Sequence, residues 1–176
     1  MSKQAQRGCV QVYTGDGKGK TTAALGLALR ASGHGLPVYI GQFMKGQDYG
    51  ELHALPLLKT VTVEQYGDPG WVHTGRVTEA QRALARAGLD KARAALTGGA
   101  YHIVILDEIN MAVWFGLLPV ESVLELIELR PPETELVLTG RRADPRVLER
   151  ADLVTEMREV RHYYASGVPA RRGIEH

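Results

Sequence analysis

The chain has 176 residues, 44% of them hydrophobic, so it is long enough to bury one compact core. Lysine and arginine number 21 against 20 acidic residues, and the formal charge of +1 gives no general reason to expect nucleic acid or an anionic membrane as a partner. Cys9 is the one cysteine, which excludes an internal disulfide within the chain. No apolar stretch approaches the roughly 20 residues of a membrane span, so we expect one cytoplasmic domain over residues 1–176.

The first chemical signal is a glycine-rich segment between a predicted strand at 8–13 and a predicted helix from Ala23 onward. Residues 14–22 read TGDGKGKTT, one position away from the phosphate-loop pattern G-x-x-x-x-G-K-[ST], because Thr14 stands where the first Gly belongs. Backbone amides of such a loop cradle phosphates, and the positive end of the following helix favours the same anion. A glycine-rich turn without a ligand is the alternative, but the position between a strand and a helix favours nucleotide binding.

Predicted strands and helices alternate along the rest of the chain. Thr78 and Gln81 match a capping box at the start of a long helix that ends near Leu96. The remaining elements are a strand at 37–43, a loop and short helix over 44–58, strands at 61–66 and 101–108, a helix over 119–130, a strand and turn over 135–141, a short helix over 145–151 and a strand at 153–157. This alternation predicts an α/β fold, a three-layer sandwich with a mostly parallel sheet.

Charged residues follow two of the predicted strands. The apolar run at 101–108 ends in Asp107 and Glu108, as a Walker B element does, and such carboxylates can hold Mg²⁺ directly or through water. Arg141 follows the strand at 135–139 and could neutralise phosphate charge. Solvated surface side chains remain the alternative in both places. Ligands of parallel α/β sheets bind at the carboxyl ends of strands, so these residues are predicted to meet the phosphate loop.

Several further segments fall in a recognisable order. They are GKGKTTAA at 17–24 with Arg30 and GHG at 33–35, QFMKG at 42–46, LDE at 106–108, TGR at 139–141, ADLVTEM at 151–157 and GVPARRGIE at 167–175. In order and spacing, over nearly the whole chain, they resemble the ATP:corrinoid adenosyltransferases of the type that carries a phosphate loop. This set is far more specific than a phosphate loop alone.

The resemblance implies a RecA-like fold, usually a homodimer, that transfers the 5′-deoxyadenosyl group of ATP to the Co(I) ion of a reduced corrinoid and releases triphosphate. This reaction belongs to the biosynthesis or salvage of adenosylcobalamin and implies ATP, Mg²⁺ and an electron-donating flavoprotein or similar reductant as partners. Co(I) is itself a strong nucleophile, so the protein must position C5′ of ATP and stabilise the leaving triphosphate. Family members bind ATP reversed along the loop, and Thr14 is compatible with that orientation.

The resemblance also assigns site residues by motif match. Lys20, Glu108 and Arg141 are the implied catalytic residues, and Thr21, Asp107 and Glu108 are the implied Mg²⁺ ligands. The implied ATP contacts are Gly15, Asp16, Gly17, Lys18, Gly19, Lys20, Thr21, Thr22, Arg30 and Arg141.

Two regions depart from the family pattern. Trp71 is the counterpart of a tryptophan that crowds the lower corrin face in better-known members, but the phenylalanine two residues before it is absent, and a packed loop aromatic stays the alternative. The N-terminus is also short and leaves little before Gly8 to cover a bound corrinoid as an N-terminal helix does in some relatives. The segment from His162 onward, which looks like a loose terminus in isolation, is a candidate cover for the corrinoid instead.

Two other functions stay open from the sequence. One is a small RecA-like kinase or ATPase that cleaves ATP at the γ-phosphate. The other is a non-catalytic, ATP-responsive corrinoid carrier or chaperone. Triphosphate and a cobalt–carbon bond as products would distinguish adenosyl transfer from both.

Overall fold

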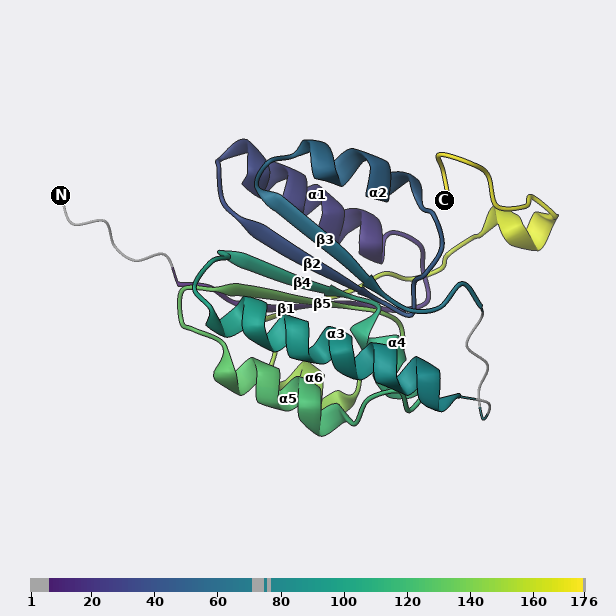
Figure 1. Cartoon of the computed structure of the whole chain (residues 1–176). Coiled ribbons are helices and arrows are strands. Elements are labelled where there is room, and N and C mark those ends of the chain that lie inside the picture. The colour runs from purple at the N-terminus through teal and green to yellow at the C-terminus, as the bar shows by residue number, and fades with distance from the viewer. Residues whose placement is uncertain (1–6, 71–74, 76, 176) are drawn as a thin grey trace.

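The computed structural model describes residues 7–70, 75 and 77–175. Six strands form one sheet in the order β3-β2-β4-β5-β1-β6, with helices on both faces (Figure 1). All of its strand pairings are parallel. The predicted three-layer α/β fold is therefore confirmed. The elements are β1 Val10–Thr14, α1 Lys20–Gly33, β2 Val38–Phe43, α2 Gly50–Ala54, the 3₁₀ turn η1 Leu55–Leu57, β3 Val61–Tyr66, α3 Glu79–Thr97, β4 Ile103–Asp107, α4 Ile109–Trp114, α5 Val120–Leu129, β5 Glu135–Thr139, α6 Pro145–Glu149, β6 Leu153–Glu156 and the 3₁₀ turn η2 Tyr163–Ser166.

The sheet separates two apolar clusters. Helices α1 and α2 lie over one face, and α3, α5 and α6 lie over the other (Figure 1). In β4, Ile103 and Ile105 belong to the cluster under α1, while Val104 and Leu106 belong to the cluster under α3 and α5. A strand in the middle of a parallel sheet is buried on both faces, which is why its sequence is continuously apolar. The prediction of a buried central strand is confirmed.

Local sequence explains where the two longest helices begin and how closely they pack. The capping box of α3 is present, because the Thr78 hydroxyl accepts the Gln81 backbone N–H and the Gln81 side chain accepts the Thr78 N–H. Helix α1 buries a stripe of alanines, Ala24, Ala28 and Ala31, at helical spacing. Small side chains let α1 lie close to the sheet, which fixes its first turn directly after the loop from β1.

Two parts of the chain differ from the sequence-based expectation. The run that follows Glu108 forms a short helix, α4, which the sequence analysis did not predict. The segment after His162 is no loose terminus: it forms η2, and its last residues, Gly173 to Glu175, return to the loop between β1 and α1. Trp71 lies outside the described residues.

The carboxyl ends of the parallel strands meet at one edge of the sheet. The loop before α1 follows β1, Lys45 follows β2, Glu108 follows β4 and Arg141 follows β5. This is the edge where parallel α/β sheets bind ligands. None of the helices in the described part of the chain has the length and apolarity needed to cross a membrane.

Candidate active site

The loop between β1 and α1 is shaped by glycines that lie against the end of β6. Gly15 has φ 91° and a Cβ there would lie 2.5 Å from the Met157 carbonyl oxygen, while Gly17 donates its N–H to that oxygen at 2.6 Å. Thr14 is the last residue of β1 and its carbonyl accepts the Met157 N–H at 2.8 Å. The turn therefore starts at Gly15, which explains why a threonine is tolerated where the pattern has its first glycine.

Lys20 lies inside this loop. Its side-chain ammonium donates to the carbonyl oxygens of Gly15 (2.7 Å) and Gly17 (2.6 Å), and the residue is 6% exposed. Burial and the nearby charge of Arg141 lower the pKa of Lys20. The first amides of α1 have no acceptor within the helix and point toward the same space. The loop thus concentrates donors and positive charge as an anion site requires.

Behind the loop, Asp107 joins three elements. Its Oδ1 accepts the hydroxyls of Thr21 (2.9 Å) and Thr139 (2.7 Å), and its Oδ2 lies 2.8 Å from the ammonium of Lys45. Asp107 is fully buried, so its charge needs these partners. Burial alone would lower the pKa of Lys45, but the charge and hydrogen bond of Asp107 raise it, so Lys45 is charged.

Glu108 faces the cavity from the start of α4. Its backbone has φ 60°, a left-handed conformation that turns the chain sharply after β4, and its N–H donates to the Thr139 hydroxyl at 3.0 Å. Burial and the negative charge of Asp107 raise its pKa, although Lys45, Lys20 and Arg141 act in the opposite direction. A carboxylate in this position gains from a cation beside it.

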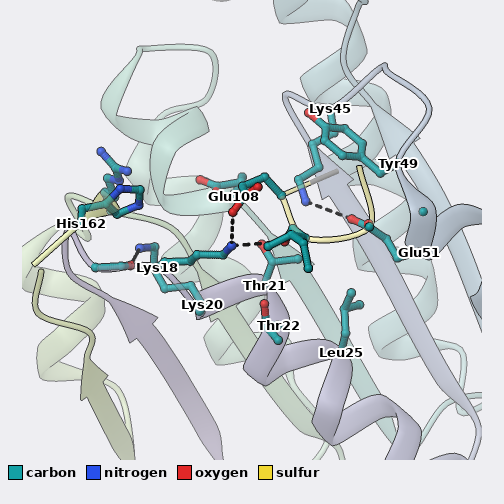
Figure 2. Close-up of a pocket in the computed structure, with 17 residues that line it drawn as sticks. Lys18, Lys20, Thr21, Thr22, Leu25, Lys45, Tyr49, Glu51, Glu108 and His162 are labelled. Carbon is teal, nitrogen blue, oxygen red and sulfur yellow. Dashed lines mark hydrogen bonds and ion pairs between the residues drawn. The ribbon is translucent and has the colours of Figure 1, made fainter. Parts of the chain in front are cut away.

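Lys20, Lys45 and Glu108 line one cavity of about 600 Å³. Figure 2 shows Lys20, Thr21 and Glu108 in its middle, Lys45, Tyr49 and Glu51 on one side, and Lys18 and His162 on the other. Lys45 also approaches Glu51 Oε1 at 3.5 Å. The remaining lining residues are Gly17, Gly19, Thr22, Leu25, Gly50, Arg141, Gly173, Ile174 and Glu175. The cavity falls within the size range of small-molecule sites.

Comparison with known proteins identifies the family. The model of the ATP:corrinoid adenosyltransferase BtuR/CobO/CobP family matches residues 6–176. The chain belongs to this family. Corrinoid adenosyltransferases of Escherichia coli K12 and Salmonella typhimurium LT2 are each 38% identical over 175 residues, which cover 98% of this chain and 88% of the relative. That of Pseudomonas aeruginosa PAO1 is 37% identical over 172 residues, covering 97% and 84%. The resemblance read from the sequence is confirmed.

Among solved structures, domain III of the Thermotoga maritima replication initiation protein DnaA matches with a TM-score of 0.46 and 13% identity, covering 88% of this chain and 56% of that chain. This likeness is too low to carry an argument about the adenosyltransferase chain.

Most residues that the sequence assigned to the adenosyltransferase site lie at the cavity, and some do not. The cavity is lined by Gly17, Lys18, Gly19, Lys20, Thr21, Thr22, Glu108 and Arg141. Gly15, Asp16 and Asp107 are not part of its wall, and Asp107 lies behind Thr21. Arg30 lies in the last turn of α1, about 15 Å along the helix from Lys20. Within one chain, the structure does not bring Arg30 to the loop. Trp71 lies outside the described residues.

Several wall residues were not among those predicted from the sequence. Lys45 belongs to a segment that the family resemblance used, and its position directly after a strand could have marked it as a site residue. Tyr49, Glu51 and His162 carry no comparable local signal, because their places depend on how distant segments fold together.

Proposed function

We propose that this adenosyltransferase transfers the 5′-deoxyadenosyl group of ATP to the Co(I) ion of a reduced corrinoid and releases triphosphate. The observation that carries the proposal is the loop with Lys20 enclosed by its own carbonyls, in a chain that belongs to the corrinoid adenosyltransferase family over residues 6–176. The named relatives are corrinoid adenosyltransferases that the chain covers over 84% to 88% of their length.

The chemistry asks little of a protein nucleophile. Co(I) supplies the electron pair that forms the cobalt–carbon bond. The bond between C5′ and the triphosphate oxygen breaks, and triphosphate leaves with the electron pair of that carbon–oxygen bond. What remains for the chain is to orient C5′ toward cobalt and to stabilise the leaving negative charge. Lys20 and Arg141 are the cavity cations suited to that charge.

ATP is proposed to lie along the loop with its phosphates near the first turn of α1. The proposed contacts are residues 15–22, with Gly17 to Thr22 as the part that lines the cavity. Gly15 and Asp16 would act mainly by shaping the loop. Arg30 is left out of the proposed site because of its distance along α1.

Mg²⁺ is proposed to accompany ATP. Thr21 and Glu108 both line the cavity with oxygen atoms, Asp107 lies behind Thr21, and oxygen is the ligand type that Mg²⁺ prefers. Among the described residues there is no cluster of three or more His, Cys, Asp or Glu side chains suited to a metal. This fits a cation that keeps waters and takes substrate phosphates as ligands, where it would offset the triphosphate charge.

The wider setting of the reaction is also proposed. Corrinoid cobalt reaches the Co(I) state only with a strong electron donor, so we propose a reduced flavoprotein or similar donor as a partner in the cytoplasm. From the family resemblance we also propose that the chain forms a homodimer and that Trp71 contacts the corrin. Residues 1–176 would form one adenosyltransferase domain.

Replacing Lys20 tests the assignment of the loop. Lys20→Ala should lower the rate of corrinoid adenosylation by on the order of 10²-fold or more, the usual cost of removing a preorganised charge contact. Lys59→Ala is the matched control, because Lys59 is an exposed lysine outside the cavity. A Lys20→Ala protein that turns over like the Lys59→Ala protein would refute the role.

A further inference from the structure

Lys18 belongs to the phosphate loop, but its ammonium points to the C-terminal segment. It donates to the Tyr163 hydroxyl (2.9 Å), to Glu175 Oε1 (2.9 Å) and to the Ile174 carbonyl oxygen (3.2 Å). A lysine ammonium has three N–H donors. All three therefore have acceptors in the chain, and none is left for a phosphate unless one of these bonds breaks. Lys20, two residues later, points into the loop instead.

Glu175 is the centre of this contact. Its Oε1 accepts the Tyr163 hydroxyl as well as Lys18, and it lies 3.2 Å from the Arg171 guanidinium, while its Oε2 accepts the Arg171 backbone N–H at 2.7 Å. Hydrogen bonds from Arg171, Tyr163 and Lys18 lower the pKa of Glu175 below its ordinary value. The Arg171 guanidinium lies 4.8 Å from the centre of the Tyr163 ring. These residues thus form one connected cluster, in which Glu175 binds both Tyr163 and Arg171 of its own segment and Lys18 of the loop.

The cluster sets one wall of the cavity. His162, Gly173, Ile174 and Glu175 line the same space as the phosphate loop. Figure 2 shows Lys18 and His162 together on the side opposite Lys45 and Glu51. Among the described residues, the hydrogen bonds that join the segment to the loop are the three donated by Lys18. Releasing them would open the cavity to water on this side.

We propose that Lys18 is a positioning residue that anchors the C-terminal segment as a wall of the nucleotide cavity, with Tyr163 and Glu175 as its partners. The role of the wall in adenosyl transfer rests on the proposed function, but the anchor itself concerns only the retention of ATP. This inference changes the expectation for Lys18, whose side chain would hold the wall and leave phosphate binding to its backbone and to Lys20.

The sign of one effect separates this role from direct phosphate binding. If the Lys18 side chain binds phosphate and the segment merely competes for it, Glu175→Gln and Tyr163→Phe should free the ammonium and tighten ATP binding. If Lys18 anchors the wall, both changes should weaken ATP binding. We expect the dissociation constant of MgATP to rise roughly 3- to 10-fold, a reduced value for charge-assisted bonds that are partly exposed.

The chain offers a matched control for each change. Tyr164→Phe removes a hydroxyl from the neighbouring tyrosine, which is 73% exposed and whose hydroxyl has no partner among the described residues. Glu159→Gln removes the same charge as Glu175→Gln from an exposed position in the connection to the segment. Calorimetric titration of each full-length variant with MgATP, without corrinoid, measures the dissociation constant directly.

A double variant and proteolysis complete the test. Lys18→Met combined with Glu175→Gln should bind MgATP no more weakly than Lys18→Met alone, because both break the same anchor. Trypsin should cleave after Arg171 or Arg172 faster in Glu175→Gln than in Glu159→Gln. Unchanged or tighter ATP binding in the Glu175 and Tyr163 variants, additive losses in the double variant, or equal cleavage would overturn the anchor. Since no corrinoid is present, these results stand or fall independently of the proposed transfer reaction.

Discussion

Lys45 and Asp107 form the most deeply placed ion pair of the site, and removing one member should be costly. Their side chains are 14% and 1% exposed, and their charged atoms lie 2.8 Å apart. Lys45→Met would leave the Asp107 carboxylate buried without its cation, which typically costs about 3 to 5 kcal/mol. Urea unfolding of the variant against the unmodified chain measures the loss.

A double variant in which Asp107 is also replaced provides the control. Lys45→Met combined with Asp107→Asn leaves no buried charge, and the Asn side-chain oxygen can still accept the hydroxyls of Thr21 and Thr139. The double variant should recover much of the stability that Lys45→Met loses. A single Lys45→Met variant as stable as the unmodified chain would show that the pair does not stabilise the fold.

The buried carboxyl group of Glu108 is expected to lower the stability of the folded chain at neutral pH. Its pKa is raised by burial and by Asp107, so the unfolded chain releases this proton at lower pH than the folded chain. As pH rises above the ordinary carboxyl value of about 4.3, the folded state therefore loses stability, until Glu108 ionises in the folded chain as well. Below that value both states are protonated and the effect disappears.

Glu108→Gln should consequently unfold at higher urea concentration than the unmodified chain at pH 7, and at nearly the same concentration at pH 4. The same variant should lose most adenosyl transfer, because the proposed Mg²⁺ site loses a carboxylate. A variant that is less stable than the unmodified chain at pH 7 would contradict the raised pKa.

At the scale of elements, two helical glycines should respond oppositely to the same change. A Cβ at Gly88 in α3 would lie 2.6 Å from Cγ of Tyr66, whose hydroxyl is hydrogen-bonded within β3 and to Tyr39, whereas a Cβ at Gly26 in α1 meets nothing within 4 Å. Gly88→Ala should therefore destabilise the chain by about 1 to 3 kcal/mol through overpacking. Gly26→Ala should stabilise it by about 0.5 to 1 kcal/mol.

Thermal or urea unfolding of the two variants side by side checks this prediction, and each serves as the control of the other. Equal effects of the same sign would mean that helix propensity alone decides, and that the close approach of α3 to β3 carries no cost.

Helices and strands with strong local signals could be predicted from the sequence. The capping residues of α3 and the apolar run of β4 fall where they were expected. Helix α4 could not be predicted, because it starts at Glu108, whose φ of 60° is rare for residues other than glycine and is imposed by the fold around it. The C-terminal segment looks loose in the sequence because the contact that orders it is made with a distant residue. Lys18, which donates a hydrogen bond to Glu175, lies 157 positions earlier in the chain.

In the candidate site, the residues at the ends of strands could be predicted, but contacts between distant segments could not. Parallel strands bring Lys20, Glu108 and Arg141 to one edge, and this followed from the order of strands and helices alone. Arg30 does not line the cavity, because α1 runs away from the loop, and its role as an ATP contact stays a prediction from the family resemblance. Lys45 could not be paired with Asp107 before the sheet order was known, since β2 lies next to β4 only in the folded chain.

At the scale of the whole molecule, the sheet order predicts that the described chain unfolds as one unit. Strand β1 lies between β5 and β6, so the first strand depends on pairing with strands from the last third of the chain. Far-UV circular dichroism and tryptophan fluorescence should report one coincident unfolding transition. Two separated transitions would contradict a single domain over residues 1–176.

The same whole-molecule view places the phosphate loop, Glu108 and the anchored C-terminal segment around one cavity. Adenosyl transfer requires that this cavity hold ATP for attack at C5′ and not at the γ-phosphorus, which is where a kinase or ATPase reaction occurs.

The most direct measurement is therefore an anaerobic reaction with MgATP and a chemically reduced corrinoid, in which the loss of Co(I) absorbance is followed and the phosphate product is identified. We predict a cobalt–carbon corrinoid and one triphosphate for each Co(I) consumed. ADP and inorganic phosphate as products, or tight corrinoid binding without turnover, would contradict the account.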